Sequence, residues 1–264
     1  MKVTLTKITE GFILLTLVNL SQIPSAVSLP IQEITKIAQE VTVKIDGVEP
    51  GTGVIVEQQN NIYTVLTNCH VVDTAGQYTI ETYDGKSYPF EINTPKSNCH
   101  SEADLALVRF TSSLPYRVVQ LWDSSRLKIG DKVYVSGWKS RGQYSQGQRR
   151  YRFADTQVIG LDRKATKGYS LAYNGFTNDD NPGLAAPEPG MSGGPILDAQ
   201  GRLVAINGLF AQNPNIGVGE FLAVPINVYT TWQNIVLNIP EIPSRPTVIK
   251  PESSPNNCIR ASGC

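Results

Sequence analysis

The sequence predicts an all-β fold with a short helix near its C-terminal end. Between about residues 41 and 210, short apolar or alternating runs recur at intervals of roughly 8–12 residues. Gly, Asn and Asp turn signals separate these runs, a pattern typical of a β-barrel or a β-sandwich. Helical periodicity is confined to the flanks of the region. With 264 residues, 41% of them hydrophobic, the chain can bury one large or two small cores.

Tight turns connect several of the expected strands. Asn60-Asn61 and Asp84-Gly85 separate apolar runs and favour β-hairpins. The predicted strands are 41–45, 53–57, 62–66, 78–83, 87–92, 105–110, 132–137, 157–161, 170–173, 195–197 and 203–207. The predicted helices are 31–39 and 228–237, the second with apolar residues along one helical face.

The two ends of the chain differ from this central region. Residues 1–28 predict a removable signal peptide, because Lys2 and Lys7 precede an apolar run and 26–28 (AVS) offer small residues for cleavage. An uncleaved anchor is the alternative, but a spanning helix needs about 20 apolar residues and this run is near half of that. We therefore expect export to the periplasm or the exterior, without stable membrane insertion. Residues 239–264 are rich in proline and predict an extended tail.

Charge and cysteine content restrict the partners and the compartment. The 23 Lys+Arg balance the 23 Asp+Glu, so no strong field favours nucleic acid. The four cysteines suit an oxidising compartment and allow three pairings; they are Cys69, Cys99, Cys258 and Cys264. Cys69-His70 and Cys99-His100 invite a zinc interpretation, but neighbouring side chains on a strand point to opposite faces. We expect no metal and no cofactor.

The strongest functional signal is the segment 190–195, GMSGGP. A serine between glycines can lie on a sharp turn whose N–H groups converge on a developing oxyanion. The segment alone fits two unrelated hydrolase folds, and also a plain turn. The only histidines, His70 and His100, both precede Ser192, so the order Ser–acid–His of an α/β-hydrolase cannot be completed. The order His–Asp–Ser remains, which disfavours an esterase of that fold.

A serine hydroxyl needs a nearby base, and histidine suits that role because its usual pKa lies near physiological pH. His70 follows an apolar strand, whereas His100 lies in a polar stretch and is expected to be a surface loop residue. Asp104 begins an apolar run and is favoured over Glu102 as the carboxylate that orients the base. The candidate catalytic residues are therefore His70, Asp104 and Ser192.

Three motifs follow one another along the chain: 67–72 (TNCHVV), 104–108 (DLALV) and 190–195 (GMSGGP). Together they resemble those of the chymotrypsin/trypsin-like superfamily, most closely the bacterial high-temperature-requirement type of protease domain. The resemblance covers roughly residues 40–237. It implies two packed antiparallel β-barrels in a protease domain at 29–238, with the boundary between the halves near 115–130. It also implies a serine endopeptidase that cleaves proteins or peptides through an acyl-enzyme, with the N–H groups of Gly190 and Ser192 as the oxyanion hole.

The resemblance extends to substrate binding and to activation. It assigns Ala186, Ile206, Asn207 and Gly208 to substrate binding, and Ala186 in place of an acidic residue predicts cleavage after small or medium apolar residues. Met191 occupies the position of the aspartate that pairs with a new N-terminus in zymogen-type members. Met191 cannot form that ion pair, so we expect an N-terminally extended chain to stay active.

Two points remain open from the sequence. If His70 and Asp104 meet, their flanking segments lie close, which favours Cys69–Cys99 and leaves Cys258–Cys264 to close a small loop in the tail. A catalytically silent protein-binding domain on the same scaffold is the alternative function, although a silent domain has no reason to keep all three catalytic groups.

Overall fold

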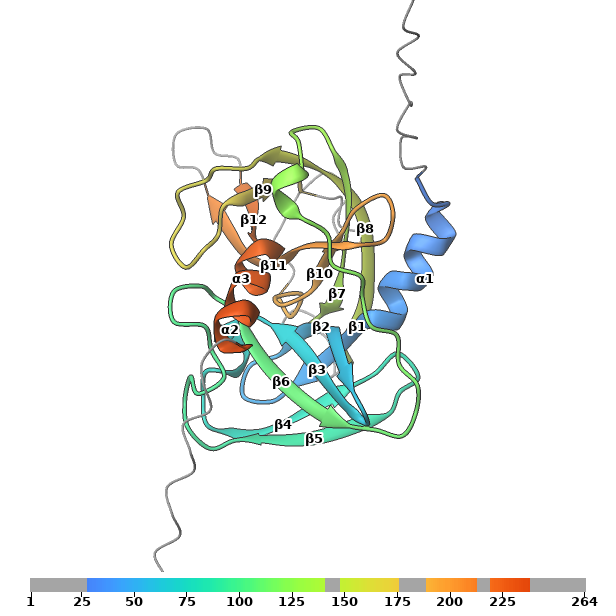
Figure 1. Ribbon diagram of the computed structural model, residues 1–264, viewed down its shortest axis with the longest axis vertical. Helices are drawn as coiled ribbons and strands as arrows, with labels where there is room; N and C mark the ends of the chain where they lie inside the picture. The colour runs from blue at the N-terminus through green and yellow to red at the C-terminus, as the bar shows by residue number, and fades with distance from the viewer. Residues whose placement is uncertain (1–27, 141–147, 176–188, 213–218, 238–264) are drawn as a thin grey trace, which may run out of the picture.

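The computed structural model describes residues 28–140, 148–175, 189–212 and 219–237. Two β-barrels lie one above the other in Figure 1, the N-terminal barrel below and the C-terminal barrel above. This architecture confirms the predicted fold class, two packed antiparallel barrels with a C-terminal helix. The expected signal peptide, the Pro-rich tail, Cys258, Cys264 and Ala186 fall outside the described residues, apart from Ser28.

The N-terminal barrel is a nearly closed six-stranded sheet in the order β5-β4-β1-β2-β3-β6, with every neighbouring pair antiparallel. Its strands are β1 (Thr42–Asp46), β2 (Gly51–Gln59), β3 (Ile62–Thr67), β4 (Gly76–Glu81), β5 (Ser87–Ile92) and β6 (Ala106–Thr111). The hairpins predicted at Asn60-Asn61 and Asp84-Gly85 connect β2 to β3 and β4 to β5. Asn60 has φ 56° and Gly85 φ 76°, left-handed values that suit these residue types at tight turns.

The C-terminal barrel is closed, in the order β10-β11-β12-β9-β8-β7. Its strands are β7 (Lys132–Lys139), β8 (Arg150–Gly160), β9 (Leu171–Tyr173), β10 (Pro195–Leu197), β11 (Leu203–Gln212) and β12 (Gly219–Pro225). A short 3₁₀-helix, η1 (Ser124–Arg126), lies on the connection between the two barrels.

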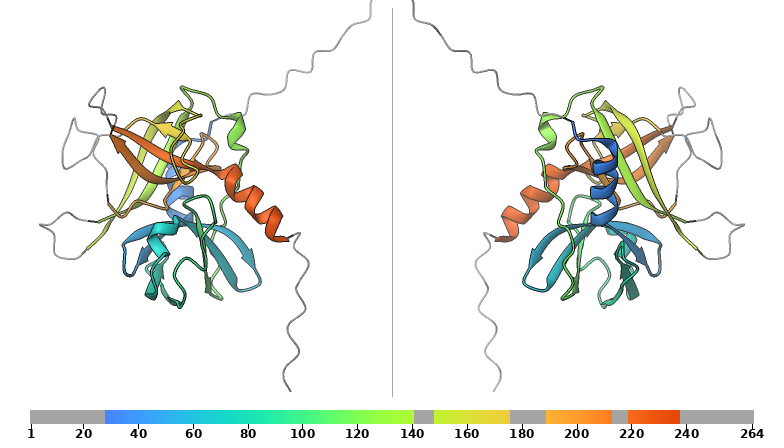
Figure 2. Two further views of the ribbon diagram at one scale, coloured as in Figure 1. Left: turned by 90° about the vertical axis from the view of Figure 1, so that its left-hand side faces the viewer. Right: turned by 90° about the vertical axis from the view of Figure 1, so that its right-hand side faces the viewer.

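Three α-helices complete the described fold: α1 (Ile31–Val41), α2 (Cys69–Val72) and α3 (Ile226–Leu237). α1 runs beside both barrels and α3 lies at their junction (Figure 2). Ile34, Ala38 and Val41 of α1 and Tyr229 of α3 are buried in one core cluster that also takes residues from both barrels. Two further clusters fill the interiors of the individual barrels. The cluster at the junction therefore fixes one barrel against the other.

Two strands extend well beyond their predicted bounds. β8 begins at Arg150 instead of 157, and β11 continues past 207 to Gln212. The first half of β8 is only half-buried, so it lacks an apolar signal, and its pairing with β7 from Arg150 onward stabilises it instead. In β11 the pairing register shifts between Asn207 and Leu209, where Gly208 interrupts the apolar pattern.

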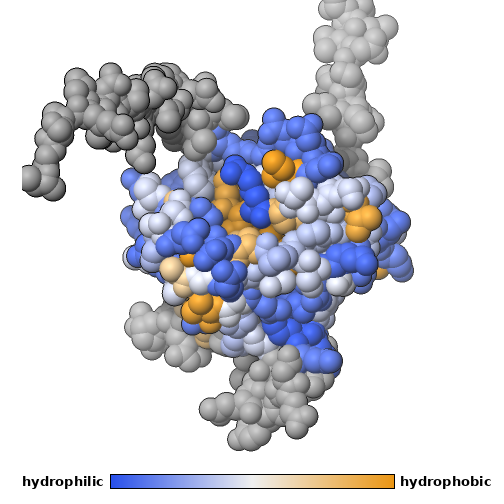
Figure 3. All heavy atoms as spheres, turned by 90° about the horizontal axis from the view of Figure 1, so that it is seen from below, coloured by the Kyte–Doolittle hydropathy of each residue, from blue (hydrophilic) through white to orange (hydrophobic). Residues whose placement is uncertain are grey.

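The surface of the described residues is mostly hydrophilic on the face drawn in Figure 3, with an apolar hollow near its middle. Within the described ranges no helix combines the length and the apolar character needed to cross a membrane.

Candidate active site

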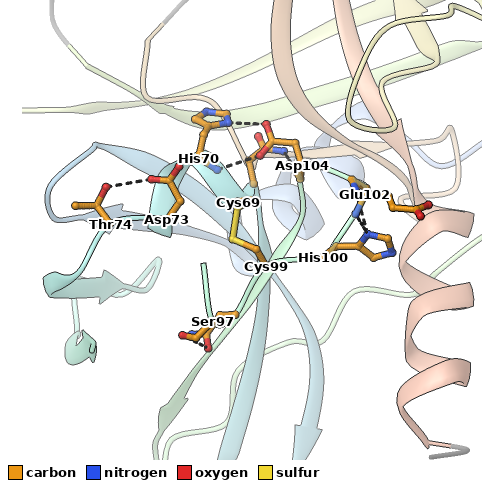
Figure 4. The surroundings of a disulfide bond; sticks show 12 residues. Cys69, His70, Asp73, Thr74, Ser97, Cys99, His100, Glu102 and Asp104 are labelled. Carbon is orange, nitrogen blue, oxygen red and sulfur yellow. Dashed lines mark hydrogen bonds and ion pairs between the residues drawn. A yellow bond between two sulfur atoms is a disulfide. The ribbon is translucent and has the colours of Figure 1, made fainter. Parts of the chain in front are cut away.

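His70 and Asp104 form a hydrogen-bonded pair at the junction of the barrels. The Nδ1 atom of His70 lies 2.7 Å from Oδ2 of Asp104, and the His70 backbone N–H donates to Oδ1 at 3.0 Å (Figure 4). Asp104 is only 4% exposed, whereas the His70 side chain is 39% exposed. The carboxylate therefore fixes the imidazole from the buried side while the ring stays accessible.

Burial raises the pKa of Asp104, but hydrogen bonds and the charge of His70 outweigh it. The net effect lowers the pKa from 3.8 to about 2, with the Tyr169 hydroxyl contributing to the decrease. Asp104 is therefore ionised at neutral pH. An ionised carboxylate next to Nδ1 stabilises the proton on that atom and leaves Nε2 of His70 free to act as a base.

Local structure on both sides places the pair. His70 follows strand β3, as expected, and lies on the one-turn helix α2. The Asn68 side-chain amide donates to the Asp104 carbonyl at 2.7 Å. Cys69 forms a disulfide with Cys99, with Cα atoms 5.2 Å apart, as in the pairing favoured from the sequence. The disulfide and the Asn68 contact tie the start of α2 to the segment that precedes Asp104.

His100 has a structural role in the segment before Asp104. Its Nδ1 accepts hydrogen bonds from the backbone N–H groups of Glu102 and Ala103, both at 3.0 Å, and its ring packs edge-on against Trp232 of α3. His100 lies in a loop, as the sequence predicts, and is half-buried there. Glu102 is exposed, and its backbone contacts His100, not His70. Among the described residues, no cluster of His, Cys, Asp or Glu side chains could hold a metal ion.

Tyr169 is a functional candidate that the sequence does not reveal. Its hydroxyl donates to Oδ2 of Asp104 at 2.6 Å, and the Asp104 backbone N–H donates to the carbonyl of Lys167 at 2.9 Å. Tyr169 is 3% exposed and lies just before β9 in the opposite barrel. No motif surrounds it, and only the packing of the two barrels brings its hydroxyl to Asp104.

Replacement of Tyr169 with phenylalanine is expected to destabilise the protein by roughly 1.5–3 kcal/mol at neutral pH, because a hydrogen bond to a charged group is lost. Since the folded-state pKa of Asp104 is lowered, the ionised carboxylate stabilises the fold above about pH 4, and this contribution is lost as the pH falls toward 2. The variant should lose less stability over that interval than the native chain. Urea unfolding at pH 7 and pH 2.5 measures both effects.

Tyr229→Phe is the control for this change, because the buried Tyr229 hydroxyl has no hydrogen-bond partner within the described residues. Equal losses of stability in the two variants would contradict the assignment of the Tyr169 contact.

Each backbone carbonyl of residues 189–192 accepts at least one hydrogen bond, and these bonds hold the segment around Ser192. Pro189 O accepts from the Ser140 N–H at 2.6 Å, and Ser192 O accepts from the Thr52 N–H at 2.8 Å. The carbonyl of Gly190 accepts hydrogen bonds from Thr52 Oγ1 and Arg149 Nη2. The carbonyl of Met191 accepts from the Gly194 N–H and from Asn207 Nδ2. The N–H groups of Gly190 and Ser192, by contrast, have no acceptor within the described residues. Two backbone donors are therefore available to an incoming group.

The glycines of this segment are required by its geometry. Gly190 has φ 91° and Gly193 φ 86°, values that side chains with a Cβ rarely adopt. A Cβ on Gly193 would also collide with Thr52 O and Thr67 Oγ1 of the N-terminal barrel. Met191 is 2% exposed and packs on Gly137, so the residue preceding Ser192 is anchored by apolar contact.

These contacts bring Ser192 against the residues that precede His70. Gly193 adjoins Thr67, and Ser192 Oγ lies 3.5 Å from the carbonyl of Gly208. A Cβ on Gly208 would in turn lie 2.6 Å from Asn68 Oδ1. The serine segment therefore lies against Thr67, three residues before the histidine, while Gly208 beside Ser192 lies against Asn68.

The remaining sequence-assigned residues have different surroundings. The Ile206 side chain is fully buried in the core between the barrels, and its strand pairs with β10 on one side and β12 on the other, so the side chain is not exposed to a substrate. Asn207 accepts from the Tyr173 hydroxyl at 2.6 Å and donates to Met191 O at 2.9 Å, which makes it a support for the serine segment. Gly208 lies beside Ser192 Oγ.

Reduction of the Cys69–Cys99 disulfide is expected to destabilise the protein by roughly 3–4 kcal/mol, because the bond closes a loop of sequence separation 30. A cleft of about 250 Å³ borders both cysteines, so a small thiol can reach the bond without unfolding. The C69A/C99A double variant should show the same loss in urea unfolding, and the C258A/C264A double variant is the matched control. A loss below 1 kcal/mol would contradict the prediction.

Comparison with known proteins supports this description. Residues 51–206, more than half of the chain, match the family model "Trypsin-like peptidase domain". The chain is 30% identical over 183 residues to "Serine protease Do-like HtrA" of Bacillus subtilis, which covers 67% of this chain and 37% of that protein. It is 30% identical over 200 residues to "Putative serine protease HhoA" of Synechocystis sp. (70% of this chain, 42% of that protein) and 28% identical over 192 residues to "Periplasmic serine endoprotease DegP" of Salmonella typhimurium (67% and 34%).

The family match includes strands of both barrels. The chain spans little more than a third of the length of the Bacillus relative. The family match alone covers residues 51–206, which include His70, Asp104 and Ser192. The chain belongs to the trypsin-like peptidase domain family.

Proposed function

We propose that the chain is a serine endopeptidase in which Ser192 is the nucleophile, His70 the general base and Asp104 the residue that orients His70. The observation that carries this proposal is the 2.7 Å contact between His70 Nδ1 and Asp104 Oδ2. The contact directs the Nδ1 proton to the carboxylate, so the lone pair of Nε2 remains on the accessible side of the ring.

In the first step, Nε2 of His70 takes the proton of Ser192 Oγ as that oxygen bonds to the carbonyl carbon of a bound peptide. The carbonyl oxygen becomes an oxyanion, and the free N–H groups of Gly190 and Ser192 would donate to it. When the C–N bond breaks, Nε2 gives its proton to the leaving amine. The acyl group remains on Ser192.

Hydrolysis of the acyl-enzyme uses the same groups in reverse order. Water enters in place of the leaving amine, and His70 takes one of its protons as the oxygen attacks the acyl carbon. The proton then returns to Ser192 Oγ as the carboxylic acid departs. Met191 is held by packing and not by an ion pair, so we expect the segment containing Ser192 to keep its conformation without a newly cut N-terminus.

Proteins or peptides are the proposed substrates, since the similar proteins are named as serine proteases. Small or medium apolar residues before the cleaved bond remain the proposed preference. We also propose export to the periplasm or the exterior, with removal of residues 1–28 and a protease domain at 29–238. Support comes from the relatives named as periplasmic and from the Cys69–Cys99 disulfide, which an oxidising compartment preserves.

The test is labelling with a fluorophosphonate, which bonds covalently to an activated serine. The native chain should be labelled and Ser192→Ala should not, with the same thermal unfolding midpoint for both. A second serine of the same barrel, Ser170→Ala, provides a matched control that should be labelled normally. A folded native chain that resists labelling would favour the alternative, a catalytically silent protein-binding domain.

A further inference from the structure

Arg149 forms a buried link between the two barrels beside Ser192. Its side chain is 9% exposed and pairs with Asp46 Oδ1 at 2.8 Å. The guanidinium also donates to the carbonyls of Ile45 and Gly51 in the N-terminal barrel, both at 2.7 Å. Arg149 precedes β8 directly, so it belongs to the C-terminal barrel and reaches across the junction.

The same guanidinium holds the backbone next to the nucleophile. Arg149 Nη2 donates to Gly190 O at 2.9 Å and also contacts Trp138 O, which belongs to the strand opposite the serine segment. Thr52 Oγ1 is the other donor to Gly190 O, at 2.7 Å, and it accepts from the Trp138 N–H at 2.9 Å. Gly190 O is therefore held by two donors, one of which is a buried charge.

The Gly190 carbonyl matters because it governs how two N–H groups are presented. The N–H of Gly190 belongs to the peptide group between residues 189 and 190. The carbonyl of Gly190 belongs to the next peptide group, which leads to Met191 and Ser192. Glycine at φ 91° has a low barrier to other conformations, so its neighbouring peptides rotate unless something holds them. Met191 is apolar and offers no charge to do so.

We propose that Arg149 is the positioning residue of the oxyanion hole, a buried clamp that fixes the Gly190–Met191 peptide and so aligns the N–H groups of Gly190 and Ser192. This inference rests on the proposed function. The planar guanidinium suits the role because its fork of donors serves several carbonyls at once, whereas lysine presents a single point charge. Arg149 acts through the backbone and does not contact the reacting atoms.

The test compares Arg149→Gln and Arg149→Lys with the native chain. We expect Arg149→Gln to lower kcat on a fluorogenic peptide by roughly 10- to 100-fold with little change in KM, because misplaced oxyanion donors weaken binding of the transition state. The second-order rate of fluorophosphonate labelling should fall by a similar factor. Arg149→Lys, which keeps the charge but not the fork, should recover part of that loss.

Arg202→Gln is the matched control. Arg202 is comparably buried, at 14% exposure, and pairs with Asp198, but it lies on the turn between β10 and β11. Its loss should alter the unfolding midpoint without reducing kcat. Two results would overturn the inference. In the first, Arg149→Gln reduces kcat no more than Arg202→Gln does. In the second, Arg149→Gln changes KM but leaves kcat unchanged.

Thr52→Val keeps the test decisive if Arg149→Gln does not fold. It removes the second donor to Gly190 O from a fully buried position with little change in shape. It should lower kcat, and unchanged kcat would count against the clamp. A native chain that is not labelled at all would instead refute the proposed function, whereas normal labelling of the native chain and of Arg149→Gln would refute only the role of Arg149.

Discussion

Replacement of His70 with alanine is expected to lower kcat by roughly 10⁶-fold, the scale seen when the base of a comparable triad is removed. The physical reason is the loss of the proposed base for the Ser192 proton, since His70 is the histidine bonded to the buried Asp104. Initial rates on a fluorogenic peptide, with active protein quantified by its unfolding transition, measure the effect.

His100→Ala is the control for this change. His100 supports the segment before Asp104 through its Nδ1, so its loss should lower stability while kcat stays within about tenfold of the native value. If both histidine variants lost activity equally, or if His70→Ala kept more than a hundredth of it, the assignment of the base would be wrong.

The second large effect is expected from Asp104→Asn. Equivalent changes in trypsin-like triads lower kcat by about 10⁴-fold, because an amide can donate to Nδ1 and stabilise the wrong imidazole tautomer. The amide also takes away the ionised partner of Tyr169, whose hydroxyl donates to Oδ2. kcat at neutral pH is the direct measurement.

Glu102→Gln is the matched control for Asp104→Asn. Glu102 lies two residues away but is exposed, and only its backbone takes part in the His100 contact. Its kcat should remain near that of the native chain. A larger loss of kcat with Glu102→Gln than with Asp104→Asn would show that Glu102, and not Asp104, orients His70.

The residues of the candidate triad could be selected from the sequence because each lies in a short local pattern. The serine segment needs glycines for its backbone geometry, and the position of both histidines before Ser192 excludes one competing order. Asp104 begins an apolar strand segment, and this segment is buried whereas Glu102 is exposed. Short motifs and the order of residues along the chain can both be read directly from the sequence.

Tyr169 and Arg149 have no such local signature. The Tyr169 hydroxyl reaches Asp104 over a sequence separation of 65, and Arg149 contacts Asp46 over a separation of 103. Both contacts cross between the barrels, so they depend on how the shared core of α1, α3 and the two sheets fixes the junction. The extended start of β8 likewise has no local signal, since its stability comes from pairing with β7 and not from its own apolar pattern.

The most direct test of the account is a crystal structure of the chain after reaction with a peptidyl phosphonate. The account predicts a bond between phosphorus and Ser192 Oγ, a phosphonyl oxygen within hydrogen-bond distance of the N–H groups of Gly190 and Ser192, and His70 Nε2 beside the serine oxygen. An adduct on another residue, or a His70 ring turned away from Ser192 while Asp104 still holds Nδ1, would contradict it.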